Sequence, residues 1–149
     1  MASIALTTFA LTLALFQMSS CKKADAETPK TYPIEGLWIG TYSADQIEYQ
    51  GQGDLFYSFI IYPNGILLTK GKGGDGKDHY STGTWTLTSS NIFSGTISTF
   101  FPGSGLPIIQ SITATYSNSG TLTNGIWNDT VNPYGSPLSG KFSTMQRVN

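Results

Sequence analysis

Cysteine, histidine and charged side chains are all scarce in this sequence. Among its 149 residues there is one cysteine, Cys21, and one histidine, His79. A single cysteine excludes an intrachain disulfide, and these two residues are too few for a structural or catalytic zinc site. Charged residues make up only 11% of the chain and the formal net charge is -1, so a basic surface for nucleic acid is not expected. We therefore expect neither a metal site nor a nucleic-acid partner.

Long apolar runs are also missing. The run from Ile4 to Phe16 is too short to cross a bilayer comfortably, but it fits the hydrophobic region of a signal peptide. Small residues, Ser19 and Ser20, then lead into Cys21. This arrangement resembles a bacterial lipoprotein signal, in which small residues precede a cysteine that is lipidated and becomes the new amino terminus. An ordinary signal peptide with an incidental cysteine is the alternative interpretation.

The lipoprotein resemblance implies where the protein is located in the cell. Residues 1–20 would be removed, and Cys21 would anchor the protein to a membrane of the bacterial cell envelope. The residue after the cysteine is Lys22 and not aspartate, which by the same resemblance implies the outer membrane. The sequence does not distinguish its periplasmic face from its surface face. Residues 21–33 are charged and contain alanine and proline without apolar periodicity, so they are expected to form a flexible tether.

The rest of the chain is rich in aromatic residues (13%), in glycine (17 residues) and in threonine and serine. This composition is typical of strands joined by frequent turns, and no segment shows sustained helical spacing of apolar residues. About 130 residues remain after the signal, which is enough for one domain. Because the apolar segments follow one another too closely for helical crossovers, neighbouring strands should be antiparallel. The sequence predicts an all-β domain over residues 34–149.

Eight strands are expected, and they should form an up-and-down β-barrel. Short connections rich in residues that tolerate positive φ alternate with longer ones, so the tight turns should lie at one end of the barrel and the long loops at the other. The long-loop end would be the mouth, and the tether would emerge at the opposite, closed base. The expected strands are Ile34–Ser43, Asp54–Tyr62, Gly65–Gly71, His79–Leu87, Ile92–Phe100, Ile108–Ser117, Gly120–Asn128 and Leu138–Gln146.

All three tryptophans follow a glycine by two residues. Residues two apart on a strand share a face, so the glycine is expected to leave room for the large ring inside the barrel. By strand order the first two tryptophans should lie towards the base and the third near the mouth. The pairs are Gly36 with Trp38, Gly83 with Trp85, and Gly125 with Trp127.

The pattern Gly36-Leu37-Trp38 on the first strand of such a meander resembles the calycin group, and with the late Arg147 it is similar to the lipocalins in particular. The resemblance implies a small barrel in which Arg147 packs over Trp38 at the closed end, as a cation-π pair. Gly36, Trp38, Trp85 and Arg147 are thus expected to be structural residues of the barrel base. The chain has no recognisable second lipocalin motif, and no ligand follows from the resemblance.

Catalytic chemistry has little support in the residues. Gly103-Ser104-Gly105 is not a nucleophile elbow, and the glycine spacing matches no nucleotide-binding loop, so no cofactor is expected. The loop from Gly73 to Asp78 lacks the alternating acidic ligands of a calcium-binding loop. Asp45 and Glu48 are interpreted as exposed loop charges. We expect that the protein is not an enzyme.

Aromatic residues near the expected mouth are the best candidates for a binding site, because they combine apolar faces with polar tips. They predict that the anchored barrel binds a small amphipathic or hydrophobic ligand at its long-loop end. The alternative is a structural or interaction lipoprotein with a filled barrel, which docks on another envelope protein through loops bearing Phe100, Phe101 and Tyr134. The candidate ligand-binding residues are Trp127, Tyr42, Tyr57, Tyr80 and Phe100.

Overall fold

The computed structural model describes residues 33–46, 48, 52–101 and 105–148. These residues belong to one compact unit, Thr31–Asn149. The expected signal peptide, Cys21, nearly all of the tether, and Ser104 lie outside the described residues. Within the described part, no helix has the length and apolar character needed to cross a membrane.

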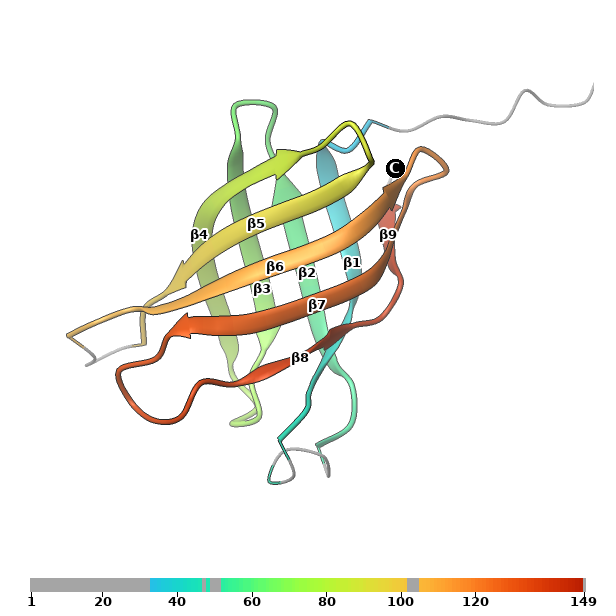
Figure 1. The fold of residues 1–149 in the computed structure, drawn as a ribbon. Helices are drawn as coiled ribbons and strands as arrows, with labels where there is room; N and C mark the ends of the chain where they lie inside the picture. Colours follow the sequence, from blue (N-terminus) through green and yellow to red (C-terminus); the bar gives the residue numbers. More distant parts are fainter. Residues whose placement is uncertain (1–32, 47, 49–51, 102–104, 149) are drawn as a thin grey trace, which may run out of the picture. The chain divides into compact units, whose positions relative to one another are not determined.

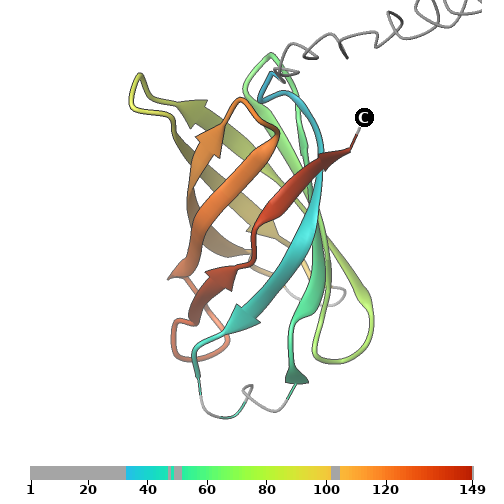
Figure 2. The same ribbon diagram turned by 90° about the vertical axis from the view of Figure 1, so that its right-hand side faces the viewer.

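The described residues form nine strands in one antiparallel sheet that closes on itself (Figures 1 and 2). Each strand from β1 to β7 pairs with the next along the chain. β8 and β9 do not pair with each other, and each of them pairs with β7 on one side and with β1 on the other. Because β8 and β9 occupy one strand position, this is the closed eight-stranded all-β barrel that the sequence predicts. The strands are β1 (Gly36–Ala44), β2 (Leu55–Ile61), β3 (Ile66–Lys72), β4 (Asp78–Leu87), β5 (Ile92–Thr99), β6 (Ile108–Ser117), β7 (Thr121–Val131), β8 (Ser139–Phe142) and β9 (Met145–Val148).

The eighth strand position is broken where the sequence predicts one continuous strand. Tyr42 of β1 pairs with Phe142, while Ile39 pairs with Gln146, so three residues on the eighth strand face two on β1. Ser143 fills the irregularity, because its backbone N–H donates to the Thr41 carbonyl at 2.9 Å and its hydroxyl accepts from the Thr41 N–H at 2.9 Å. This is a β-bulge in which a side chain replaces a backbone partner.

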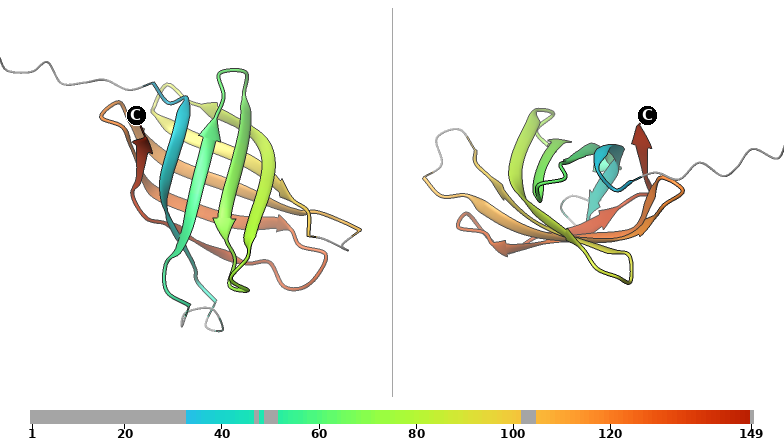
Figure 3. Two further views of the ribbon diagram at one scale, coloured as in Figure 1. Left: turned by 180° about the vertical axis from the view of Figure 1, so that it is seen from behind. Right: turned by 90° about the horizontal axis from the view of Figure 1, so that it is seen from above.

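The two kinds of connection separate to opposite ends of the barrel, as expected. Figure 1 shows the tight turns β2–β3, β4–β5 and β6–β7 towards the top and upper right, where the chain also enters β1, and the strand ends that lead into the longer connections at the left and the bottom. Left-handed backbone conformations occur in the tight turns, at Gly65 (φ 82°) and at Asn91 (φ 60°). Figure 3 shows β1 to β4 side by side on the far wall of Figure 1.

The hydrophobic core fills the barrel from the tight-turn end towards its middle. Its largest fully buried side chains are Trp38, Phe59 and Phe93, whose relative exposure is 0%. Phe59 and Phe93 lie on opposite walls with ring centroids 5.8 Å apart, so they bridge the interior. The bridge closes this half of the barrel with packed rings.

Two of the three tryptophans lie against glycines, but not against the glycines two residues earlier. In the sheet register, Trp85 lies opposite Gly95 and Trp127 lies opposite Gly140 on the neighbouring strands. A Cβ at Gly140 would come within 2.7 Å of the Trp127 indole nitrogen, so the space that the ring uses belongs to the cross-strand partner. Trp38 has no glycine opposite it, since it pairs with Phe59 and Arg147.

The glycines of the repeated pattern make room for other groups. A Cβ at Gly36, where φ is +133°, would lie 3.0 Å from the Arg147 guanidinium. A Cβ at Gly125 would lie 2.7 Å from Cβ of Phe142, and one at Gly83 would meet the backbone of β5. The pattern therefore marks close contacts between strands and not pockets for the tryptophan that follows each glycine.

The base of the barrel contains the residues expected there. Trp38 donates its indole N–H to the Ile34 carbonyl at 2.7 Å, and Trp85 donates to the Tyr62 carbonyl in the β2–β3 turn at 2.8 Å. Arg147 lies directly across from Trp38 and donates from Nε and Nη2 to the Glu35 carbonyl, at 3.1 and 3.0 Å. Arg147 thus ties the last strand to the segment that leads into β1.

Replacing Arg147 by alanine should lower the free energy of unfolding by about 1–2 kcal/mol, because a charged donor is removed from a carbonyl and the ring of Trp38 loses a neighbour. Urea denaturation followed by circular dichroism measures the change. Lys141→Ala, on the exposed side of β8, is the control and should change stability by less than about 0.5 kcal/mol. Equal effects of the two substitutions would show that Arg147 does not brace the base.

Candidate functional site

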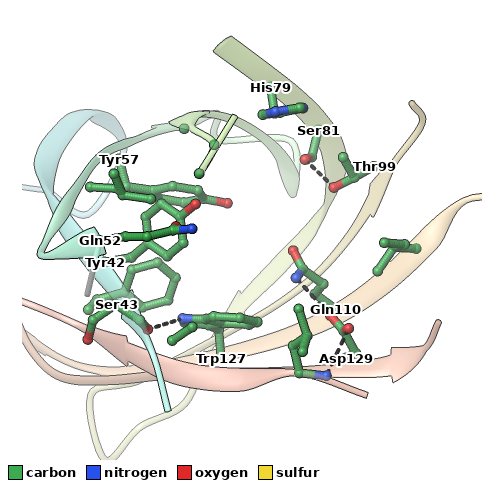
Figure 4. A pocket seen from close by; sticks show the side chains of 18 of the residues that line it. Tyr42, Ser43, Gln52, Tyr57, His79, Ser81, Thr99, Gln110, Trp127 and Asp129 are labelled. Atoms are coloured by element: carbon green, nitrogen blue, oxygen red, sulfur yellow. Dashed lines mark hydrogen bonds between the residues drawn. The ribbon is translucent and has the colours of Figure 1, made fainter. Parts of the chain in front are cut away.

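A cavity of about 570 Å³ opens into the long-loop end of the barrel. All eight strand positions contribute to its wall or rim together with the adjoining loops, and Figure 4 shows side chains converging on it from several directions. The ends of β1, β4, β5 and β7 that lead to the loops frame it. The volume falls in the range of sites that hold one small molecule.

The inner part of the cavity is aromatic. Tyr42 contacts Tyr57 edge to face, with centroids 5.3 Å apart, and contacts Trp127 in the same way at 6.1 Å. Tyr57 also packs on Phe142 at 5.2 Å. Ile112 continues this apolar surface on β6. The result is an apolar floor above the packed core.

The polar tips of these aromatic residues are occupied by the protein itself. The Tyr42 hydroxyl donates to the Lys72 carbonyl at 2.9 Å, and the Tyr57 hydroxyl donates to Thr69 Oγ1 at 3.0 Å. The Trp127 indole N–H donates to the Ser43 carbonyl at 3.1 Å. Burial raises the pKa of Tyr57, and burial followed by the negative charge of Asp75 raises the pKa of Tyr42, so both hydroxyls stay neutral. A molecule in the cavity would therefore contact their ring surfaces.

One side of the cavity carries a buried carboxylate. Asp129 is only 7% exposed, and its Oδ1 accepts from the Gln110 amide at 2.9 Å. Its Oδ2 accepts from the Asn132 amide at 2.7 Å and from the Leu138 backbone N–H at 3.0 Å. These three neutral donors hold the carboxylate in place and tie the β7–β8 connection to the wall of the barrel. Buried carboxylates usually need such partners.

The opposite side of the cavity carries a second polar group. His79 Nε2 lies 3.0 Å from Asp75 Oδ1, and the imidazole also contacts the Phe101 ring at 5.0 Å. The hydrogen bond from His79 holds the pKa of the Asp75 carboxyl below its usual range, so this group stays ionised near neutral pH. Ser81 lies two residues along β4, and its hydroxyl bonds to Thr99 at 2.6 Å.

Three of the candidate ligand-binding residues come together at this cavity, namely Tyr42, Tyr57 and Trp127. Tyr80 and Phe100 do not reach it and are 64% and 61% exposed on the outside of the barrel. Strand alternation is the reason, because the inward positions beside them belong to His79 and Phe101. Tyr80 and Phe100, which the sequence offers as candidates, therefore do not line this cavity.

Most lining residues were not among the candidates, although sequence signals pointed to two of the polar ones. Asp129 lies two residues after Trp127 on β7 and so shares its face, and His79 is the inward neighbour of Tyr80. Gln110 carries no such signal, because its facing depends on where β6 begins. Once one residue of a strand is known to face inward, alternation fixes the facing of the others, and this would have identified Asp129 and His79.

The carboxylates of the glycine-rich loop turn to different partners. Asp75 pairs with His79, whereas Asp78 lies 2.9 Å from Lys70 and 3.3 Å from Lys72. Within the described residues, no cluster of three or more histidine, cysteine or acidic residues could hold a metal ion.

Comparisons of the chain with protein-family models, with curated proteins and with solved structures find no match. The closed barrel agrees with the architecture that the lipocalin resemblance implies, and membership of that family stays a prediction.

Proposed function

We propose that this protein is a non-enzymatic binding protein that holds a small amphipathic or hydrophobic molecule in the long-loop end of its barrel. The observation that supports it is the cavity of about 570 Å³ beside Trp127, which has an aromatic floor and a few convergent polar groups. Sites for small molecules usually combine these features. A barrel built only for docking would be packed to both ends.

The location belongs to the same proposal. Because its first residues resemble a lipoprotein signal, we propose that the protein is anchored through Cys21 to the outer membrane of a bacterial envelope. The chain enters β1 at the tight-turn end, opposite the cavity. A tether that leaves from that end would direct the cavity away from the membrane, which suits the capture of a ligand from the surrounding space.

Docking on another envelope protein is the second candidate, and one observation favours it. Leu106 and Tyr134 are 59% and 54% exposed on neighbouring loops, and the Tyr134 hydroxyl donates to the Leu106 carbonyl at 2.6 Å. This bond holds two largely apolar side chains together at the surface, and Phe100 is a further exposed aromatic residue. An apolar rim of this kind suits a protein partner, and it is compatible with a ligand inside.

The test uses N-phenyl-1-naphthylamine, an uncharged fluorescent dye whose emission rises in apolar surroundings. We expect saturable binding, and Ser81→Phe should weaken it by about ten-fold or more because a ring at this lining position fills the cavity. Thr82→Phe is the matched control, since Thr82 is the next residue on β4 and faces outward. Failure of the dye to bind, or equal binding by both variants, would overturn the proposal.

A further inference from the structure

The charged groups that line the cavity are unusual in their sign. Apart from His79, the charged lining residues in the described part of the chain are Asp75 and Asp129, with no lysine or arginine among them. Lys70 and Lys72 are paired with Asp78, while His79 and Lys77 lie close enough to Asp75 to lower the pKa of its carboxyl, so the charge of Asp75 is partly compensated. The cavity is therefore a negatively charged site above an aromatic floor.

Asp129 contributes more to the negative charge of the cavity than Asp75 does, because of where it lies. It is buried, and its three partners are neutral donors, so they satisfy its oxygens without compensating its charge. Outside water, an uncompensated charge attracts a counter-charge more strongly than at the surface. A cationic group entering the cavity would supply that counter-charge.

Gln110 extends the acidic site towards the ligand. A carboxylate only accepts hydrogen bonds, so the amide nitrogen of Gln110 must face Asp129, at 2.9 Å. The amide oxygen is then directed elsewhere, and Figure 4 shows it pointing into the cavity. This oxygen receives no hydrogen bond within the described residues, so it can accept one from a ligand.

Together these groups offer acceptors and negative charge at the polar end of the cavity. We propose that the ligand is an amphiphile with a protonated amine as its head group, placed near Gln110 and Asp129, and with its apolar part against Trp127 and Phe142. A fatty carboxylate would place a second negative charge beside Asp129 and is disfavoured. This inference rests on the proposed function, since it names the chemical class that the same cavity takes.

The test compares three molecules with the same twelve-carbon chain, dodecylamine, dodecanoate and dodecanol, as competitors that displace N-phenyl-1-naphthylamine near neutral pH. Dodecylamine should displace the dye at about one tenth of the concentration that the other two require. In Asp129→Asn this preference should fall to about two-fold or less. Asp78→Asn is the control, because it removes a carboxylate outside the cavity and should keep the preference.

Asp129 also holds the β7–β8 connection, so circular dichroism must show that Asp129→Asn is folded. Should it not fold, Asp75→Asn decides, because Asp75 lies at the exposed rim and its loss should reduce the preference about three-fold.

Dodecanoate or dodecanol binding as tightly as dodecylamine would overturn the inference and leave the binding function standing. A folded carboxylate variant that keeps the full preference would overturn it too. Absence of dye binding in the unchanged protein is the distinct failure of the proposed function.

Discussion

Trp38→Ala should lower the free energy of unfolding by about 3–5 kcal/mol, the range found when a large ring is deleted from a packed core. Trp38 is 0% exposed, packs edge to face on Tyr116 at 6.3 Å and donates its indole N–H to the Ile34 carbonyl. The substitution removes the ring contacts and leaves that carbonyl without its donor. Urea denaturation followed by far-ultraviolet circular dichroism measures the loss.

The control for Trp38 is Ile126→Ala, because Ile126 is 50% exposed on the outside of β7. It should change stability by less than about 0.5 kcal/mol. Trp38→Phe keeps an aromatic ring and loses the indole hydrogen bond, so it should be intermediate and should fold even if the alanine variant does not. Unfolding of Trp38→Phe at the same urea concentration as the unchanged protein would contradict the role given to Trp38.

Gly140→Ala should destabilise the protein by about 3 kcal/mol, at the upper end of what overpacking costs. A Cβ at this position would overlap the Ser43 carbonyl oxygen and would lie 2.7 Å from the Trp127 indole nitrogen. Neither atom can move freely, since the indole N–H is bonded to that carbonyl. We expect β8 to shift away from β1, and the tryptophan emission spectrum to change with it.

Gly105→Ala is the matched control for Gly140→Ala. A Cβ at Gly105 meets nothing within 4 Å, so the same methyl group is added in open space. Its effect on the urea midpoint should be within about 0.5 kcal/mol of zero, and the emission spectrum should not change. If the two alanine variants were equally stable, the close approach of β8 to β1 would not limit side-chain size.

The architecture was predictable because it depends on local signals. Turn residues such as Gly65 and Asn91 locate the hairpins, and consecutive hairpins leave the chain no other route than an antiparallel meander. The break in the eighth strand was not predictable. It depends on Ser143 replacing a backbone partner of Thr41, a contact between residues 102 positions apart.

The candidate site was predictable only in part, because strand facing could not be fixed. β1 and β2 carry large apolar residues on both faces, and Leu37, Ile39 and Ile60 are 36%, 37% and 39% exposed on the outer one. The alternation of residues along these strands therefore does not show which face points into the barrel. The same ambiguity left Tyr80 and Phe100 among the candidates, although their neighbours His79 and Phe101 occupy the inward side.

The pairing of β9 with β1 has a consequence for how the chain acquires its structure. Arg147 donates to the carbonyl of Glu35, which lies 112 residues earlier in the chain. The second edge of β1 is therefore covered only after almost the whole domain has been synthesised. Contacts of such long sequence separation slow folding, and an uncovered strand edge invites pairing with other chains. Until β8 and β9 pair with β1, the sheet is open and one edge of β1 is accessible to other chains.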